Sequence, residues 1–455
     1  MKSFLSLLCL LSFGWIALDV VGPSVHEEVE VCPAVPDFTQ FFQQVPSLGR
    51  RVRVASPCIG IDACGHALDY MGVPADMCNA YDLEAGYMDV LMRRMREAGM
   101  EVIKLHLGRE QGNLLKVGLL DLESPVDFLV SGPPCPPWAG QGNKRGLNDE
   151  RAAVFVRVLM WVFFFVKCGG LLGCILENVV GITHEVDGIE SAMSKFLRVL
   201  SNYLPEFAWK VDILKATEYM LPQTRVRVFL RGLRKSISNT VPPCLPPFGH
   251  RDIRECLGDF PYTPRSAYTG PQQRNLKQFE QVICRRVREG TLEMDDVVFV
   301  SVDRSQDRIY KQIITVNAAP TLTTHNVYLV VLSVGDVVQS VPDSERRFFR
   351  LLADSERLAL QGIPPKLLLS LPQGKAVLAS GNTFPTSLII ACMQPLLMSI
   401  ARSSVDFKSW PPPHFLQRTL PTGIDTFIRA VKAKGRRMKA GPSQARKRRR
   451  SDSDD

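Results

Sequence analysis

Short apolar runs alternate with longer helical patterns through the first half of the chain, from Val52 to about Leu233. Val126–Val130 and Cys174–Leu176 have the length and composition of buried strands. Residues 151–166 follow a helical pattern that becomes wholly apolar, but this segment is shorter than a membrane span and charges flank it. Because strands alternate with helices, the pattern predicts an α/β fold with a mostly parallel sheet covered on both faces.

The pattern changes twice further along the chain. Proline, glycine and tyrosine are frequent from Val241 to Pro271, which is typical of a change of domain. Regular patterning returns near Ile313 and continues to about Ser403. These changes predict five parts: a leader and linker (1–50), a first large part (51–233), a small second domain (234–312), a part that completes the large domain (313–405) and a basic disordered tail (406–455).

The net charge of +9 is unevenly distributed. The segment from Lys432 to Asp455 has ten Lys/Arg against three Asp, and Gln223–Gly290 has thirteen Arg/Lys against five Asp/Glu. A compact basic region within a nearly neutral body indicates a face for a phosphate backbone. An ordinary solvated surface with the same composition is the alternative.

The two ends of the chain carry conflicting targeting signals. The apolar run Phe4–Val21 follows Lys2 and is typical of a secretory signal or a short anchor. The basic tract 432–450 is typical of a nuclear-import signal or a DNA-binding arm. We expect the tail to decide, and predict a nuclear protein that binds an import receptor; an organelle or secretory leader is the alternative.

The cysteines and histidines do not form a metal-binding pattern. None of the twelve cysteines stands in a CxxC pair, and the seven histidines form no spaced cluster with them. This distribution argues against a zinc site and against a disulfide scaffold, and it favours a reducing compartment. We therefore expect no metal.

A cysteine among prolines follows the first predicted strand, in the sequence Gly132-Pro-Pro-Cys135-Pro-Pro-Trp138. The prolines fix the backbone on both sides of the thiol. Open α/β sheets build their sites at the carboxyl ends of parallel strands, which makes Cys135 a candidate nucleophile. Taken alone, a cysteine in this setting is more often structural.

Two further motifs carry polar side chains. Leu176-Glu177-Asn178-Val179 ends the second predicted strand, where burial can raise the pKa of a carboxylate so that it donates a proton. In Pro222–Phe229, alternation places Gln223, Arg225 and Arg227 on one face of a strand. An edge strand with a charged outer face is the alternative reading of this last segment.

Together, and in this order, the three motifs resemble those of the DNA cytosine-C5 methyltransferase family. The resemblance covers roughly residues 52–403. Four more stretches carry it: the loop Gly142–Arg151, Ala319–Thr324, Arg350–Pro364 with its Leu360-Gln-Gly-Ile-Pro, and Ser380-Gly-Asn-Thr-Phe-Pro385.

The resemblance implies a Rossmann-like fold that uses S-adenosylmethionine and acts on a cytosine flipped out of double-stranded DNA. Cys135 would add to C6 of the base, Glu177 would contact N3 and the exocyclic amine, and Asn178 would orient the Glu177 loop. Arg227, with Arg225 nearby, would hold the base O2 and Glu177. DNA contacts are implied for Gln223, Arg145 and Arg151, and residues 234–312 take the place of the target-recognition domain.

The predicted cofactor loop departs from the family pattern. Only Gly60 falls on a family glycine; Cys58 replaces a phenylalanine and Asp62 the second glycine. Asp82 is the nearest acidic residue to the ribose-binding position, and Asn113 stands where the family has an aspartate. Pro134 and Asn382 complete the predicted cofactor set.

Two other functions are also compatible with these motifs. One branch of the same fold methylates a tRNA cytosine, but its Cys-Phe-Thr motif is absent between Gly232 and Gln312. A catalytically weak DNA-binding homologue that recruits partners would explain the altered cofactor loop. The intact Cys135 and Glu177 favour an active DNA enzyme.

Overall fold

The computed structural model describes residues 35–139, 146–261, 263, 265–303, 314–324, 329–339, 350–412, 419–433 and 435. Three features predicted from the sequence lie outside the described residues: the apolar run 4–21, Arg145, and nearly all of the basic tract 432–450.

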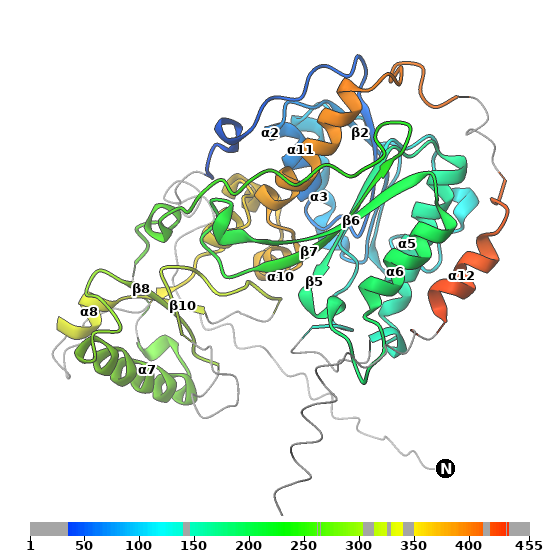
Figure 1. Ribbon diagram of the computed structural model, residues 1–455. Coiled ribbons are helices and arrows are strands. Elements are labelled where there is room, and N and C mark those ends of the chain that lie inside the picture. Colours follow the sequence, from blue (N-terminus) through cyan, green and yellow to red (C-terminus); the bar gives the residue numbers. More distant parts are fainter. Residues whose placement is uncertain are drawn as a thin grey trace, which may run out of the picture.

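A seven-stranded sheet forms the centre of the large domain (Figure 1). Its order is β3-β2-β1-β4-β5-β7-β6, and its strands are parallel except for β7, which is antiparallel to both neighbours. The predicted α/β class with a mostly parallel sheet is confirmed. The strands are β1 (Val52–Pro57), β2 (Ala75–Asp82), β3 (Leu105–Leu107), β4 (Phe128–Ser131), β5 (Gly173–Val179), β6 (Phe207–Lys215) and β7 (Val226–Arg234).

Helices cover both faces of this sheet (Figure 1). Neighbouring strand residues belong to different core clusters: Val54 and Ala55 in β1, for example, face opposite sides. One face packs against α2 (Ala63–Tyr70), α3 (Met88–Glu97) and α11 (Thr386–Arg402), and the other against α5 (Ala152–Cys168), α6 (Ala192–Tyr203) and α12 (Ile424–Lys432). Shorter helices are α4 (Gly108–Gln111), α9 (Asp354–Ala359) and α10 (Ala376–Asn382).

The apolar helix predicted at 151–166 is α5, and it is buried almost all round, as a core helix should be. Within the described residues, the helical stretch Ala376–Arg402 is long and apolar enough to cross a membrane. In the fold, however, 83% of its apolar window is buried, because α11 packs in the core.

The small domain holds a second, antiparallel sheet in the order β11-β10-β8-β9, set to one side of the large domain (Figure 1). Its elements are α7 (Gly270–Arg288), β8 (Val297–Ser301), β9 (Ile314–Val316), β10 (Leu329–Ser333), α8 (Val334–Gln339) and β11 (Arg350–Leu351). The boundary predicted at residue 312 therefore needs correction, since three strands beyond it pair with the small domain. An apolar run has the same appearance in a sequence whichever sheet it joins.

Part of the segment 406–455, which we predicted to be disordered, forms α12. Ile424, Phe427 and Val431 are spaced as one face of a helix and are buried. The Phe427 ring stacks on Phe163 of α5, with centroids 4.6 Å apart. The buried Lys195 ammonium donates to the Ala433 carbonyl where α12 ends. The basic composition of the segment led to the prediction of disorder, but this short apolar stripe is enough to pack a helix against the large domain.

Candidate active site

Cys135 lies in the loop that leaves the carboxyl end of β4. The amides of Trp138 and Ala139 both donate to the Cys135 carbonyl, at 2.9 and 3.0 Å. Gly181, just after β5, packs against the same loop so closely that a Cβ on it would lie 2.1 Å from the Trp138 carbonyl oxygen. The half-buried Cys135 is thus held by its own turn and by the segment after β5.

Glu177 and Arg227 face each other from adjacent strands, β5 and β7. The Arg227 Nε lies 2.9 Å from a Glu177 carboxylate oxygen, and both side chains are about nine-tenths buried. Asn178 donates from its amide to the Pro133 carbonyl at 3.0 Å, which fastens β5 to the Cys135 loop. The structure therefore brings the predicted catalytic motifs together at one edge of the sheet.

The surroundings of the Cys135 thiol set its protonation. Burial raises its pKa, and the negative charge of Glu177 raises it further, while Arg227 and Arg225 act in the opposite direction. The net shift is upward, so at neutral pH the thiol of the unliganded protein carries its proton.

Arg225 is buried, and its guanidinium donates to main-chain carbonyls. Its partners are Leu322 at 3.1 Å, Gly381 at 3.4 Å and Thr383 at 2.9 Å. Burial, followed by the nearby Arg227, lowers the pKa of Arg225 to about 9. Arg225 fastens residues 380–385, the last stretch that resembles the family and here called the closing motif, to the start of β7, which makes it a positioning residue.

Of the residues predicted to contact DNA, Gln223 is buried and Arg151 is exposed. Gln223 is fully buried, and its amide donates to the Leu360 carbonyl and to the Gln361 side chain. Because its side chain is not exposed, it cannot contact DNA, and the predicted DNA-binding role is wrong. Gln223 instead joins the start of β7 to the segment after α9. Arg151, at the start of α5, is half exposed and pairs with Asp149 at 2.7 Å.

The predicted cofactor residues meet at the carboxyl ends of β1 and β2. Gly60 has a φ of +57° and its amide donates to the Asp82 carboxylate at 2.9 Å. The other Asp82 oxygen accepts from the Glu84 amide at 3.0 Å, and burial raises the Asp82 pKa. A Cβ on Gly112 would lie 1.8 Å from the Asp82 carbonyl, so the turn that carries the half-exposed Asn113 closes directly onto β2.

The closing motif forms the opposite wall. The buried Thr383 hydroxyl lies beside Gly60, 3.6 Å from where a Cβ would stand, and has no hydrogen-bond partner within the part of the chain that the structure describes. Asn382 is exposed next to the Tyr87 hydroxyl. A Cβ on Gly132, two residues before the half-buried Pro134, would collide with the Phe384 ring at 2.2 Å. These segments surround the point between β1 and β4 where the strand order reverses, and open α/β sheets bind ligands there.

Asp62 occupies the place of a family glycine without obstructing this crevice. Its φ is +63°, in the left-handed region that Gly favours and Asp tolerates. The fully buried carboxylate caps α2 by accepting from the Gly65 amide at 2.9 Å, and lies 3.1 Å from Arg94 Nε. Its partners are thus on α2 and α3, which explains how the substitution is accommodated.

Tyr87, Thr383 and Phe384 also line the crevice and were not predicted from the sequence. Thr383 and Phe384 stand within the closing motif, beside the predicted Asn382. Tyr87 follows no motif, and only the fold brings its hydroxyl to Asn382.

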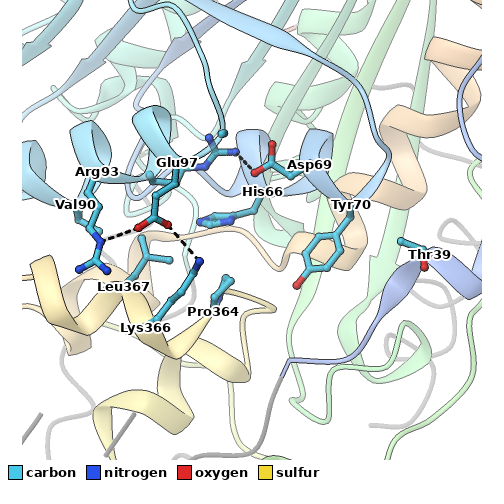
Figure 2. Close-up of a pocket in the computed structure, with 12 residues that line it drawn as sticks. Thr39, His66, Asp69, Tyr70, Val90, Arg93, Glu97, Pro364, Lys366 and Leu367 are labelled. Carbon is cyan, nitrogen blue, oxygen red and sulfur yellow. Dashed lines mark hydrogen bonds and ion pairs between the residues drawn. The ribbon is translucent and has the colours of Figure 1, made fainter. Parts of the chain in front are cut away.

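A cavity of about 450 Å³ lies elsewhere, between α2, α3 and residues 364–367. Figure 2 shows Glu97 between Arg93 and Lys366, to which it is joined at 2.9 and 3.2 Å. None of the predicted site residues lines this cavity, and its charged groups pair with one another. The predicted site residues lie instead around the crevice at the strand ends.

The fold and the crevice together define a Rossmann-like methyltransferase of the S-adenosylmethionine-dependent class. The chain belongs to the family described as C-5 cytosine-specific DNA methylase, whose model matches residues 108–396, more than half of its length.

Relatives and solved structures give the extent of the likeness. The Type II methyltransferase M.NgoBV of Neisseria gonorrhoeae is 30% identical over 152 residues, which cover 32% of this chain and 35% of that protein, about a third of its length. M.DsaV of Dactylococcopsis salina is 24% identical over 286 residues, covering 62% of this chain and 72% of that protein. The Entamoeba histolytica methyltransferase EhMeth is similar in structure, with a TM-score of 0.49 and 14% identity over 76% of this chain and 98% of that one.

Proposed function

We propose that this protein is a DNA cytosine-C5 methyltransferase that moves a methyl group from S-adenosylmethionine to a flipped-out cytosine through a covalent bond between Cys135 and C6. The observation that carries the proposal is the convergence of Cys135 and Glu177, from the carboxyl ends of β4 and β5, with Arg227, from the start of the antiparallel β7. Family membership supports the reaction type.

Cys135 performs the first step. Its thiol loses its proton and the sulfur adds to C6, which makes C5 electron-rich. Glu177 contacts N3 and the exocyclic amine and stabilises the charge that addition develops on the ring. Arg227 holds Glu177 in place through the 2.9 Å ion pair. When C5 has gained the methyl group and lost its proton, the Cys135–C6 bond breaks and the thiol is restored.

The upward pKa shift of Cys135 fits this order of events. A permanently ionised thiolate would react with any electrophile, whereas the thiol next to Glu177 stays protonated until the base arrives. When Glu177 hydrogen-bonds to the cytosine, its charge is shared with the base, and its opposition to the thiolate weakens.

The crevice fits S-adenosylmethionine. Gly112 lets its turn close onto the β2 backbone, and Gly132 leaves room for the Phe384 ring. The buried Thr383 hydroxyl beside Gly60 has no hydrogen-bond partner among the described residues. Asp82 would hold the ribose hydroxyls, and Asn113 the adenine edge. The cofactor supplies an electrophilic methyl group.

Double-stranded DNA is the proposed partner. Arg151 is half exposed at the start of α5, close enough to Cys135 for their charges to interact. Four of the thirteen basic residues between Gln223 and Gly290 are buried in the structure: Arg225, Arg227, Arg231 and Arg234. The exposed Arg274, Lys277, Arg285 and Arg288 of α7 support a phosphate-binding face. The basic tract 432–450 supports a nuclear location and binding to an import receptor.

The test is to incubate the full-length protein with tritiated S-adenosylmethionine and unmethylated duplex DNA, and to measure label in C5-methylcytosine. Cys135→Ser is the variant, and Cys244→Ser is its matched control. Label in DNA that only Cys135→Ser abolishes supports the proposal. Label only in a parallel tRNA sample would assign an RNA substrate, and a folded protein that labels neither would be a binding homologue.

A further inference from the structure

A second cysteine among prolines stands on the linker between the two domains, in the sequence Pro242-Pro-Cys244-Leu-Pro246. Its sulfur lies 3.7 Å from the sulfur of Cys392, a fully buried residue of α11. Cys244 itself is half-buried. Neither thiol takes part in the proposed methyl transfer.

A hydrogen bond from the linker to a main-chain carbonyl of α11 holds the two segments together. Pro395 has no amide hydrogen, so it cannot donate to the Ala391 carbonyl one turn earlier. The Leu245 amide, next to Cys244, donates to that carbonyl instead, at 2.9 Å. The helix and the linker are therefore joined one residue away from each cysteine.

Arg231 fixes the same two segments from the other side. Its fully buried guanidinium donates to the Pro242 carbonyl at 2.7 Å and to the Cys392 carbonyl at 3.3 Å. Asp212 balances its charge at 2.7 Å. Two rigid segments thus keep the sulfurs adjacent, and closing a disulfide requires the sulfurs to approach to about 2.05 Å.

The two thiols differ in a way that suits stepwise oxidation. The hydrogen bond with Cys392 lowers the pKa of Cys244, and the positive charges of Arg231 and Lys210 add to this, against the effects of burial and Asp212. Burial raises the pKa of Cys392. The more exposed thiol is therefore also the more readily ionised one, and the buried thiol stands behind it.

We propose that Cys244 and Cys392 form a reversible disulfide on exposure to hydrogen peroxide, which fastens the inter-domain linker covalently to α11. The Cys244 thiolate attacks the peroxide and becomes a sulfenic acid, and the released oxygen leaves as water. The Cys392 sulfur then attacks the sulfenic sulfur, and its proton departs with the hydroxyl as a second water. The two thiols lose two electrons, which reduce one peroxide to two water molecules.

The test is peptide mapping of the full-length protein after mild peroxide treatment and alkylation of the remaining thiols. We expect a peptide pair joined through Cys244 and Cys392 that dithiothreitol separates. Cys244→Ser should abolish the pair, whereas Cys284→Ser, at another half-buried cysteine, should leave it intact. In Cys392→Ala, Cys244 should accumulate as a sulfenic acid that dimedone labels.

A second readout does not depend on any variant. The disulfide would close a long loop of the chain, so the oxidised protein should melt about 5 °C above the reduced one. The proposal is overturned if Cys392 remains alkylatable after denaturation while Cys244 is oxidised further, or if Cys244 pairs with a different cysteine.

Discussion

Cys135 and Cys244 share almost the same local sequence, with two prolines before each and two prolines closely after. Cys135 follows β4, and its pKa is raised by burial and, after that, by the carboxylate of Glu177 beside it. Cys244 follows β7 and lies beside Cys392 and the guanidinium of Arg231, and its pKa is lowered. Prolines fix the backbone at both places, whereas the surroundings of the sulfur set the direction of the pKa shift: burial followed by the charge of Glu177 at Cys135, and the hydrogen bond with Cys392 followed by the charge of Arg231 at Cys244.

The comparison also separates two kinds of reactivity. A cysteine that reacts only with a bound substrate can be kept protonated by a nearby carboxylate, provided that the substrate hydrogen-bonds to this carboxylate when it binds. A cysteine that reacts with a small oxidant needs a cation and a second sulfur, and both are present at Cys244.

Replacing the two cysteines in turn should give opposite results. We expect Cys135→Ser to lower methyl transfer by at least about 1,000-fold, because a hydroxyl is a far weaker nucleophile toward C6 than a thiolate. Cys244→Ser should stay within about twofold of the wild type, since its sulfur is remote from the reaction. Initial rates with tritiated S-adenosylmethionine and duplex DNA measure both. A large loss of methyl transfer in Cys244→Ser would contradict the proposed difference between the two cysteines.

Glu177→Gln should separate catalysis from thiol reactivity. Methyl transfer should fall by about 100-fold or more, because the side chain no longer stabilises charge on the base. The pKa of Cys135 should fall at the same time, since the negative charge that raises it is gone. Alkylation of Cys135 by iodoacetamide should therefore reach its midpoint at a lower pH than in the wild type. Exposed Glu185→Gln is the matched control; an unchanged midpoint in Glu177→Gln would mean that burial alone sets the pKa.

Gly181→Ala should disturb the Cys135 loop without touching Cys244. The new Cβ would lie 2.1 Å from the Trp138 carbonyl oxygen, so the loop must move. A displacement near 1 Å can cost roughly 100-fold in rate, and we expect a loss of about 10- to 100-fold. Gly270→Ala, whose Cβ would meet only Arg274 at 3.7 Å, is the control. Peroxide-driven pairing of Cys244 should be normal in both, and full activity in Gly181→Ala would contradict the predicted rigidity.

Pro395→Ala should loosen the linker slightly. The new amide competes with Leu245 for the Ala391 carbonyl, and losing a hydrogen bond of about 1 kcal/mol corresponds to roughly fivefold faster exchange of the Leu245 amide. Between Pro243 and Pro246, Cys244 and Leu245 are the residues with amide hydrogens, so peptide-level hydrogen exchange can resolve the effect. Ser399→Ala, whose hydroxyl bonds within the same helix, is the control. Equal exchange in both variants would show that the Leu245–Ala391 hydrogen bond does not hold the linker, and would leave that role to Arg231 and to the Tyr219 hydroxyl, which donates to the Leu245 carbonyl.

Motifs at strand ends were predictable because their positions follow from local order. Cys135 and Glu177 each follow an apolar strand, and parallel strands bring their carboxyl ends to one edge, so sequence order alone places these residues together. Gln223 was predicted wrongly for a related reason: alternation tells which side chains share a face, but not whether that face is covered. The segment after α9 covers it, from more than a hundred residues away.

The α/β class, the family and the order of the chemical motifs could therefore be predicted without the structure, since these depend on local patterning and on residue types at short spacing. Four contacts could be found in the folded structure but not from the local pattern. Arg225 donates to main-chain carbonyls far along the chain, and the Asp62 carboxylate pairs with Arg94 in the core. Helix α12 packs on α5, and the Cys244 sulfur lies beside that of Cys392. Burial, neighbouring charge and sulfur–sulfur distance arise from contacts between residues far apart in the chain. Local pattern cannot specify them.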